Sequence, residues 1–362
     1  MELKLDINKS YAIALEGGGA KGAYEVGVWK ALDEAGIKYN AVAGTSVGAL
    51  NGAMMAMRDL KGAIDAWWNI RLSDIVDVNE GKEDEMLRLF AGEADMTDIQ
   101  EILPHALDII KNRGLDVSPL RRWVNRLADT AAIKNSDVEL FVSTIALSDK
   151  KGVTVKVNEL PEEEMCDMLL ASAYHPSFRL ERLGGKYYTD GGFFDSLPIF
   201  PLVERGYKDI IAVCLPGAGI HRLFIPPKDV NITYIDTEDD LGGVLSFDAA
   251  NSRRNMEIGY MDAKRVLYGL VGKRYYIEKT MDERSSLNKL IDCFYKNGSD
   301  LRHLTEKELP RLADRLDVDK GSYHDILIAH LEKLAKSRGL ERMRIYTDTE
   351  LTELVTGDDL CE

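Results

Sequence analysis

Short apolar runs alternate with helix-like segments in the first part of the chain. The apolar runs span residues 11–15 and 41–43, lengths typical of buried strands. Residues 21–35 carry apolar side chains at helical spacing until Gly36, and residues 47–57 form a second, more apolar helical segment. The order strand, helix, strand, helix predicts parallel strands joined by right-handed crossovers.

The pattern changes between residues 58 and 135, where amphipathic helical segments follow one another. Further strands are then predicted at 139–146, 153–157, 185–189, 210–215 and 232–235, with helices at 162–173 and 198–205. We predict an α/β fold, a three-layer sandwich with a mostly parallel central sheet. The main domain covers residues 10–215 with a helical insert at about 58–135, residues 216–240 end the sheet, and residues 241–362 form a mainly helical C-terminal extension.

Charge and composition narrow the class of protein. The chain has 362 residues and a formal net charge of −15, so it is a poor candidate for binding nucleic acid, and an anionic membrane would repel it except at a local basic or apolar patch. The N-terminus lacks the apolar core of a signal peptide and no apolar run is long enough to span a membrane, so we expect a cytoplasmic protein. The four cysteines form no CxxC pair, which favours reduced thiols over a zinc site or disulfides.

A serine follows the second predicted strand in the pattern Gly44-Thr45-Ser46-Val47-Gly48. This G-x-S-x-G pattern is typical of a nucleophile elbow, a sharp strand-to-helix turn that pushes the serine hydroxyl outward. A Cβ atom at either glycine would clash there, and the helix that begins at Val47 directs its positive end toward Ser46. Ser46 is therefore a candidate nucleophile, which needs a neighbouring base to take its proton.

A glycine-rich segment, Glu16-Gly17-Gly18-Gly19-Ala20-Lys21-Gly22, follows the first strand. It satisfies the G-x-G-x-x-G fingerprint of dinucleotide-binding proteins, but that site also needs a carboxylate at the end of the second strand. The second strand ends instead in Gly44-Thr45-Ser46. We therefore favour an oxyanion hole, in which backbone N–H groups at a helix N-terminus face a developing negative charge.

The base that would activate Ser46 has two candidates. Asp190 ends a predicted strand and is followed by Gly191-Gly192, although a plain turn aspartate is a common alternative. His175 lies in a loop near the sheet and leaves a Ser–His–acid triad open, whereas His221 lies in a glycine-rich loop. We interpret the histidines in charged helical segments as surface residues: His105, His303, His324 and His330.

Four segments in this order resemble the patatin-like phospholipases, a family of serine acyl hydrolases. They are the glycine loop, the Ser46 elbow, Ala171-Ser172-Ala173-Tyr174-His175-Pro176-Ser177-Phe178, and Asp190-Gly191-Gly192. The resemblance covers roughly residues 10–215, which would then be the catalytic domain. One departure is Ser196, which stands where the family often has an asparagine before Leu-Pro.

The resemblance implies a Ser46–Asp190 dyad that cleaves lipid or other esters through an acyl-serine intermediate, with His175 as a loop residue. It implies an oxyanion hole among Gly17, Gly18, Gly19, Ala20, Lys21, Gly22 and Val47, with Gly44 and Gly48 in the elbow. It implies no metal or organic cofactor, and it allows a transient contact with a membrane surface. An ordinary aspartate has a pKa of about 3.9, so partial burial must raise that pKa before Asp190 is an effective base.

Two other functions remain open at this point. An acyltransferase would use the same acyl-serine with a different acceptor, and a lipid-binding or regulatory protein would use the site without catalysis. The oligomeric state is open as well. We interpret the apolar segment 220–227, with Leu223, Phe224 and Ile225, as an ordinary loop rather than a lipid contact.

Overall fold

The computed structural model describes residues 1–77, 114–217, 219–294 and 300–356. The chain divides into two compact units. One comprises Leu5–Ala263, and the other comprises Met1–Lys4 with Lys264–Glu362. The first unit thus extends past the predicted boundary near residue 240. The reason is that the first turns of the following helix are bonded to it: the Ser252 hydroxyl donates to the Trp67 carbonyl, and the Asn255 amide to the Leu241 carbonyl.

A seven-stranded sheet forms the middle of the first unit, with the order β4-β3-β2-β1-β6-β7 and with β5 paired to β3. The neighbours along the path β3-β2-β1-β6-β7 are all parallel, whereas β4 and β5 each run antiparallel to β3. The strands are β1 (Ser10–Leu15), β2 (Lys38–Thr45), β3 (Glu139–Ala146), β4 (Lys151–Lys156), β5 (Tyr188–Asp190), β6 (Asp209–Val213) and β7 (Asn231–Ile235). The predicted α/β class is confirmed.

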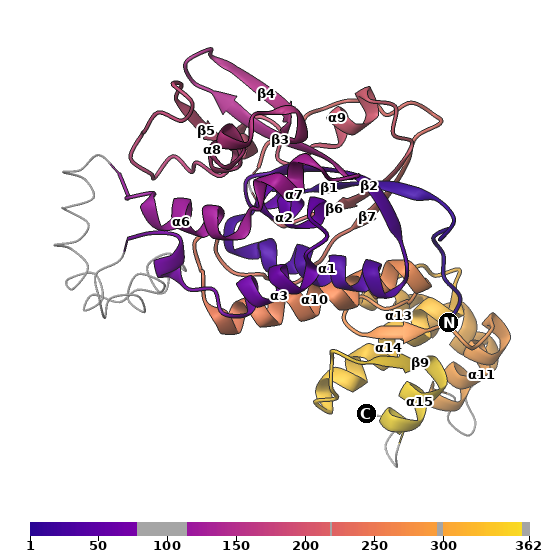
Figure 1. The fold of residues 1–362 in the computed structure, drawn as a ribbon. Coiled ribbons are helices and arrows are strands. Elements are labelled where there is room, and N and C mark those ends of the chain that lie inside the picture. The colour runs from indigo at the N-terminus through magenta and orange to yellow at the C-terminus, as the bar shows by residue number, and fades with distance from the viewer. Residues whose placement is uncertain (78–113, 218, 295–299, 357–362) are drawn as a thin grey trace, which may run out of the picture. The chain divides into compact units, whose positions relative to one another are not determined.

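Helices cover both faces of this sheet (Figure 1). On one face, small side chains of β1 and β2, among them Ala12, Ala14, Ala41 and Ala43, leave room for α9. The opposite face packs against α2, beside α1 and α3. The helices are α1 (Ala23–Glu34), α2 (Val47–Ala56), α3 (Leu60–Trp68), α6 (Ser118–Leu127), α7 (Thr130–Lys134), α8 (Glu162–Ser172), α9 (Ile199–Glu204) and α10 (Ala249–Tyr268).

The predicted elements are found with ends shifted by a few residues. The predicted strand at 139–146 coincides with β3, whereas the helix predicted from residue 21 begins as a 3-10 turn at Gly19–Gly22 before α1. Of the predicted insert at 58–135, the described parts contain α3, α6 and α7. His105 and the rest of 78–113 lie outside the described residues.

The C-terminal unit is mainly helical, as predicted, but it also holds two short parallel strands, β8 (Tyr276–Glu278) and β9 (Ile345–Thr347). Its helices are α11 (Glu283–Phe294), α12 (Leu301–His303), α13 (Leu309–Leu316), α14 (Tyr323–Ser337) and α15 (Asp348–Thr356). The prediction that His324 and His330 lie on the surface is wrong. Both are buried on α14, where His324 shares a face with Leu327 and Leu331, and its Nε2 lies 3.2 Å from Asp348.

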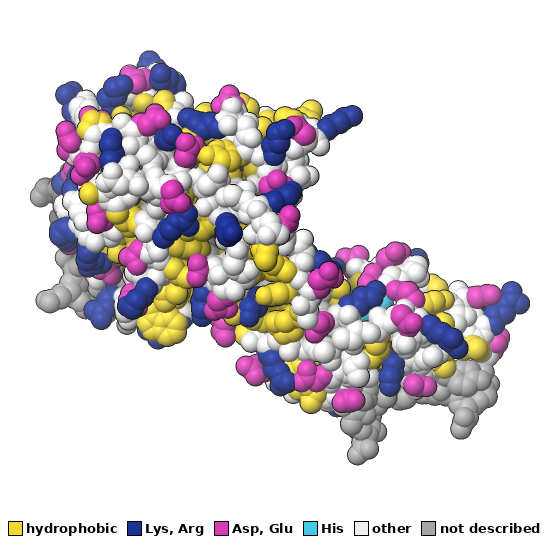
Figure 2. All heavy atoms as spheres, turned by 45° about the vertical axis from the view of Figure 1, so that its right-hand side comes forward, with side chains coloured by type: hydrophobic (Ala, Val, Ile, Leu, Met, Phe, Trp, Pro, Cys, Tyr) yellow, Lys and Arg dark blue, Asp and Glu magenta, His cyan; other side chains and the backbone are white. Residues whose placement is uncertain are grey.

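Acidic, basic and small apolar areas alternate on the face of the molecule shown in Figure 2. Within the described ranges, no helix has both the length and the apolar character needed to cross a bilayer. Among the described residues, Cys166, Cys214 and Cys293 form no disulfide bond, and Cys361 lies outside the described residues.

Candidate active site

Ser46 occupies the turn between β2 and α2 in a strained conformation. Its φ of 55° and ψ of −124° lie in a region that residues other than glycine rarely adopt, and such strain clusters at functional sites. The turn is tight because a Cβ at Gly44 would lie 2.2 Å from the Gly48 carbonyl oxygen, and a Cβ at Gly48 would lie 2.6 Å from the Leu15 carbonyl oxygen. The predicted clash at both glycines is confirmed.

The structure brings Asp190 against Ser46. The Ser46 hydroxyl donates to Asp190 Oδ2 at 2.6 Å, while Asp190 Oδ1 accepts from the Gly192 N–H at 2.7 Å. The reason lies in β3, which pairs with β2 along its first half and with β5 beyond it. The last paired residue of β2, Thr45, faces Ser143, and Asp190 of β5 faces Thr144, so the two strand ends meet.

Burial makes Asp190 a stronger base than an ordinary carboxylate. Only 7% of the residue is exposed, and this burial raises its pKa to about 6, although the hydrogen bonds from Ser46 and Gly192 act to lower it. The carboxylate is therefore still mostly ionised at neutral pH, and it accepts a proton more readily than it would in water.

Ser172 of α8 holds the strained turn in place. Its hydroxyl accepts a hydrogen bond from the Ser46 N–H at 2.8 Å and donates to the Ser143 carbonyl at 2.6 Å. Ser172 is fully buried, so no water replaces either bond if the hydroxyl is lost. It ties the Ser46 turn to β3, the strand whose Thr144 pairs with Asp190 of β5.

The glycine loop presents two kinds of N–H group. The Gly17 N–H donates to the Ser196 carbonyl, the Ala20 N–H to the Val244 carbonyl, and the Lys21 N–H to the Gly18 carbonyl. Across the described part of the chain, no acceptor is recorded for the N–H groups of Gly18, Gly19 or Val47. Gly19 has a φ of 57°, and a Cβ there would lie 2.1 Å from the Val244 carbonyl oxygen, so glycine is required.

Buried polar groups fix both ends of this loop. At its start, the Glu16 carboxylate accepts from the Leu215 N–H at 2.8 Å, from the Ser196 hydroxyl at 3.2 Å and from His221 at 2.6 Å. Ser196, the residue that departs from the family pattern, thus holds Glu16 in place.

The end of the loop is fixed from the other side. The Asn51 side-chain amide donates to the Gly22 carbonyl at 2.9 Å and to Glu25 at 2.7 Å, and its oxygen accepts from the Trp67 indole at 2.8 Å. Burial raises the pKa of Glu25 well above its usual range. The loop that offers the free N–H groups is therefore held rigidly from behind.

Two further candidate residues are not bonded to Ser46, although His175 lines the same cavity as Ser46 and Asp190. His175 Nδ1 lies 2.8 Å from the Ser177 hydroxyl, and the Ser46 hydroxyl is bonded to Asp190 instead of His175. Burial lowers the pKa of His175. The Lys21 ammonium is bonded to the Pro216 carbonyl, and burial lowers its pKa as well.

An apolar cavity of about 50 Å³ contains Ser46, Asp190, Gly19 and Val47 in its lining. Its wall is completed by side chains from several segments, including Leu50, Trp67, Leu120, Trp123, Leu245 and Phe247. The Trp67 ring meets Trp123 edge-on at 6.0 Å and stacks on Phe247 at 6.4 Å. An apolar wall beside a nucleophile suits the hydrocarbon part of a substrate.

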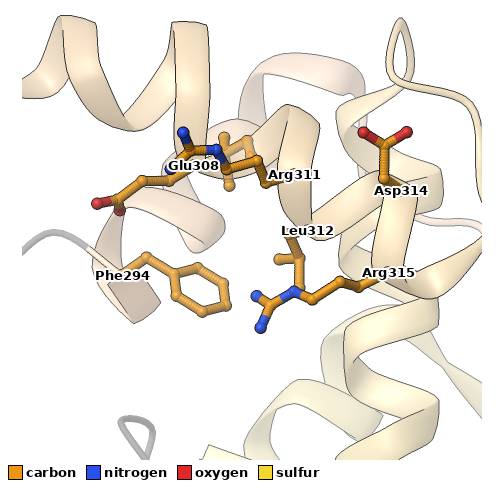
Figure 3. Close-up of a pocket in the computed structure, with 7 residues that line it drawn as sticks. Phe294, Glu308, Arg311, Leu312, Asp314 and Arg315 are labelled. Atoms are coloured by element: carbon orange, nitrogen blue, oxygen red, sulfur yellow. The ribbon is translucent and has the colours of Figure 1, made fainter.

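A larger cleft of about 550 Å³ lies in the C-terminal unit (Figure 3). Its lining consists of Phe294, Glu308, Leu309, Arg311, Leu312, Asp314 and Arg315. None of these residues carries a hydroxyl or thiol nucleophile. The larger cleft therefore lacks the chemistry of the cavity beside Ser46.

Several residues of the site carry no local signal in the sequence for the role that the structure gives them. Ser172 lies in the third motif, but its contact with the Ser46 N–H depends on how α8 packs against the sheet. Leu245 and Phe247 belong to the segment that was assigned to the C-terminal extension, yet they line the cavity. No local pattern signals either role, because both depend on contacts distant in sequence.

Comparison with known proteins gives a family match. A family model described as patatin-like phospholipase matches residues 13–203, more than half of the chain. A lysophospholipase of Debaryomyces hansenii is 23% identical over 224 residues, which are 57% of this chain and 12% of that protein. Patatin-like phospholipase domain-containing protein 6 of Mus musculus is 51% identical over 45 residues, 12% of this chain and 3% of that protein.

The chain thus spans only a small part of the length of these relatives. Among solved structures, VipD from Legionella pneumophila aligns with a TM-score of 0.42 and 14% identity, over 92% of this chain and 81% of that chain.

Proposed function

The chain belongs to the patatin-like phospholipase family, and from this premise we propose that it is a lipid acyl hydrolase with a Ser46–Asp190 dyad. The observation that carries the proposal is the 2.6 Å hydrogen bond from the Ser46 hydroxyl to a buried carboxylate. The apolar wall beside this pair suits the hydrocarbon next to an ester carbonyl, and the relatives described as lysophospholipases support a lipid ester as substrate.

In the first step, Ser46 Oγ attacks the ester carbonyl carbon while Asp190 Oδ2 takes the hydroxyl proton. The tetrahedral intermediate collapses, the carbon–oxygen bond to the alcohol breaks, and Asp190 returns the proton to the departing alcohol. Water then attacks the acyl-serine, again giving a proton to Asp190, and the fatty acid leaves as Ser46 regains its hydrogen. The geometry supports this path because one carboxylate oxygen already accepts the serine proton.

The N–H groups of Gly18, Gly19 and Val47 would hold the oxyanion. They lack acceptors among the described residues, and Gly19 and Val47 line the same cavity as Ser46. The N–H groups of Gly17, Ala20 and Lys21 are already bonded to carbonyl groups, so we assign these residues a role in shaping the loop. One oxyanion donor typically lowers the activation free energy of such reactions by about 3 kcal/mol.

A fluorophosphonate probe tests the nucleophile directly. We expect one covalent adduct per chain, located on Ser46 by peptide mass spectrometry, because the probe phosphonylates an activated serine. Ser177, which is bonded to His175, is the matched control: Ser177→Ala should still be labelled. Labelling on Ser177, or none at all, would contradict the assignment. Product analysis with an added alcohol or lysolipid would show whether the acyl group goes to water or to that acceptor.

Replacing Ser172 by alanine is expected to lower both stability and ester turnover. The change removes the acceptor of the buried Ser46 N–H and one donor to the Ser143 carbonyl, and an unpaired buried N–H typically costs about 1–3 kcal/mol. Denaturant unfolding and turnover of a nitrophenyl ester measure the two effects. Ser136 offers a control, since its hydroxyl also accepts from a backbone N–H and donates to a carbonyl. Ser136→Ala should lose stability but keep turnover per folded molecule.

A further inference from the structure

The loop between β6 and β7 exposes apolar side chains to an unusual degree. In residues 219–228, Leu223 is 97% and Ile225 is 94% exposed, and Ile220 is 53% exposed. Single exposed apolar residues are ordinary on protein surfaces, whereas a contiguous exposed group marks an interaction surface.

This loop is held in shape from beneath. Phe224 turns inward, and its ring meets Phe200 of α9 edge-on at 5.6 Å. The Arg222 guanidinium lies over the same Phe200 ring at 3.6 Å. In Figure 1 the chain between β6 and β7 passes beside α9. Leu223 and Ile225 therefore project from an ordered base, so little conformational entropy is lost when they bind a partner.

The loop is also joined to the turn that carries Asp190. The Ile220 N–H donates to the Gly192 carbonyl at 2.9 Å, and the Ile220 carbonyl accepts from the Ser196 N–H at 2.8 Å. Phe193, on the same turn, is 52% exposed. A partner surface that binds this loop would therefore also lie beside the turn that follows Asp190.

The charge of the loop differs from that of the whole chain. Residues 216–228 contain no aspartate or glutamate but include Arg222 and Lys228, although the formal net charge of the chain is −15. The next carboxylate, Asp229, is paired with Lys208 at 2.7 Å. The loop is thus the kind of local apolar and basic patch that approaches a phospholipid surface without repulsion.

We propose that residues 220–225, together with Phe193, form a docking surface for a zwitterionic phospholipid bilayer, with Leu223 and Ile225 inserted among the lipid chains. The proposal rests on the function proposed above and adds the surface from which the substrate is taken. Apolar insertion provides the binding, because the acidic chain gains nothing from an anionic membrane. The proposal departs from the expectation that this segment is an ordinary loop.

Sedimentation with phosphatidylcholine vesicles tests the docking surface. The double variant Leu223→Ser/Ile225→Ser should lose at least about tenfold in vesicle partitioning, because two buried aliphatic side chains contribute more than that. Partitioning of the unmodified protein should change little with added salt, since the contact is apolar. Ile7 provides a matched control, because it is also an exposed aliphatic residue but lies before β1. The single variant Leu223→Ser should bind vesicles more weakly, whereas Ile7→Ser should bind them normally.

Turnover of a short soluble nitrophenyl ester separates this proposal from the function itself. The double variant should keep that turnover while losing vesicle binding, and Ser46→Ala should do the reverse. Vesicle binding that is absent in the unmodified protein, or unchanged in the double variant, overturns the docking proposal and leaves the hydrolase proposal intact. If size-exclusion chromatography instead shows a dimer that the double variant converts to a monomer, the loop is a contact between copies and the proposal fails.

Discussion

Replacing Ser46 by alanine should lower hydrolysis of a short nitrophenyl ester by at least about 10⁴-fold, since removal of a catalytic serine costs that much or more in serine hydrolases. Ser46 supplies the atom that bonds to the acyl carbon, and no other hydroxyl is bonded to Asp190 among the described residues. The variant should fold, because alanine fits wherever the serine side chain fits. Initial rates with purified protein measure the effect.

Two observations guard this result against misreading. The far-ultraviolet circular dichroism spectrum should match that of the unmodified protein, and the free energy of unfolding should fall by no more than about 1–3 kcal/mol, the cost of the lost bond to buried Asp190. If the folded Ser46→Ala protein hydrolyses the ester at the normal rate, Ser46 is not the nucleophile.

Replacing Asp190 by asparagine should lower turnover by about 10²- to 10⁴-fold, the range typical of a general base. The asparagine oxygen can still accept from the Gly192 N–H, but the amide nitrogen would face Ser46 and cannot take its proton. In the unmodified protein, kcat/KM should rise as pH increases through about 6, the pKa of Asp190, and then level off. The residual rate of Asp190→Asn should lack that rise.

The same substitution should stabilise the fold at neutral pH. Burial raises the pKa of Asp190 from 3.8 to about 6, so the folded state binds this proton more tightly than the unfolded state. The contribution of the protonated carboxyl to the free energy of unfolding is fully present below pH 3.8. It is lost as the pH rises through the folded-state pKa of about 6. Asparagine does not ionise, so the Asp190→Asn variant does not lose this contribution as the pH rises. Above pH 7 its free energy of unfolding should therefore exceed that of the unmodified protein by about 3 kcal/mol.

Asp195 is the matched control for both measurements. Burial also raises its pKa to about 6, but Ser46 is bonded to Asp190 instead. Asp195→Asn should therefore raise stability over a similar pH range while leaving the dependence of kcat/KM on pH in place. If the rise in activity near pH 6 vanished in Asp195→Asn but survived in Asp190→Asn, the base would be Asp195, and the assignment of Asp190 would be contradicted.

Much of the first unit could be predicted because its signals are local. A short apolar run followed by glycine and a helical spacing predicts β1 and β2 whatever surrounds them, and the clash at Gly44 and Gly48 follows from the tight turn alone. The raised pKa of Asp190 follows from burial of a residue at a strand end.

What could not be predicted depends on long-range packing. His324 lies in a charged segment, and only the fold of the C-terminal unit shows that its face of α14 is the buried one. The end of the first compact unit at Ala263 depends on long-range contacts as well, since Ser252 is bonded to the distant Trp67 carbonyl. Sequence periodicity describes which residues share a face, but it does not describe what covers that face.

Adjacent residues of β3, Ser143 and Thr144, face the ends of β2 and β5. The separation of nucleophile and base is therefore set by the repeat of one extended strand, about 3.3 Å per residue. The described parts of the insert at 58–135 contribute Trp67, Leu120 and Trp123 to the cavity wall but lie outside β3 and do not fix that separation. Insertions and deletions there can reshape substrate choice while the reacting atoms stay in register, so chemistry and selectivity can evolve independently on this scaffold.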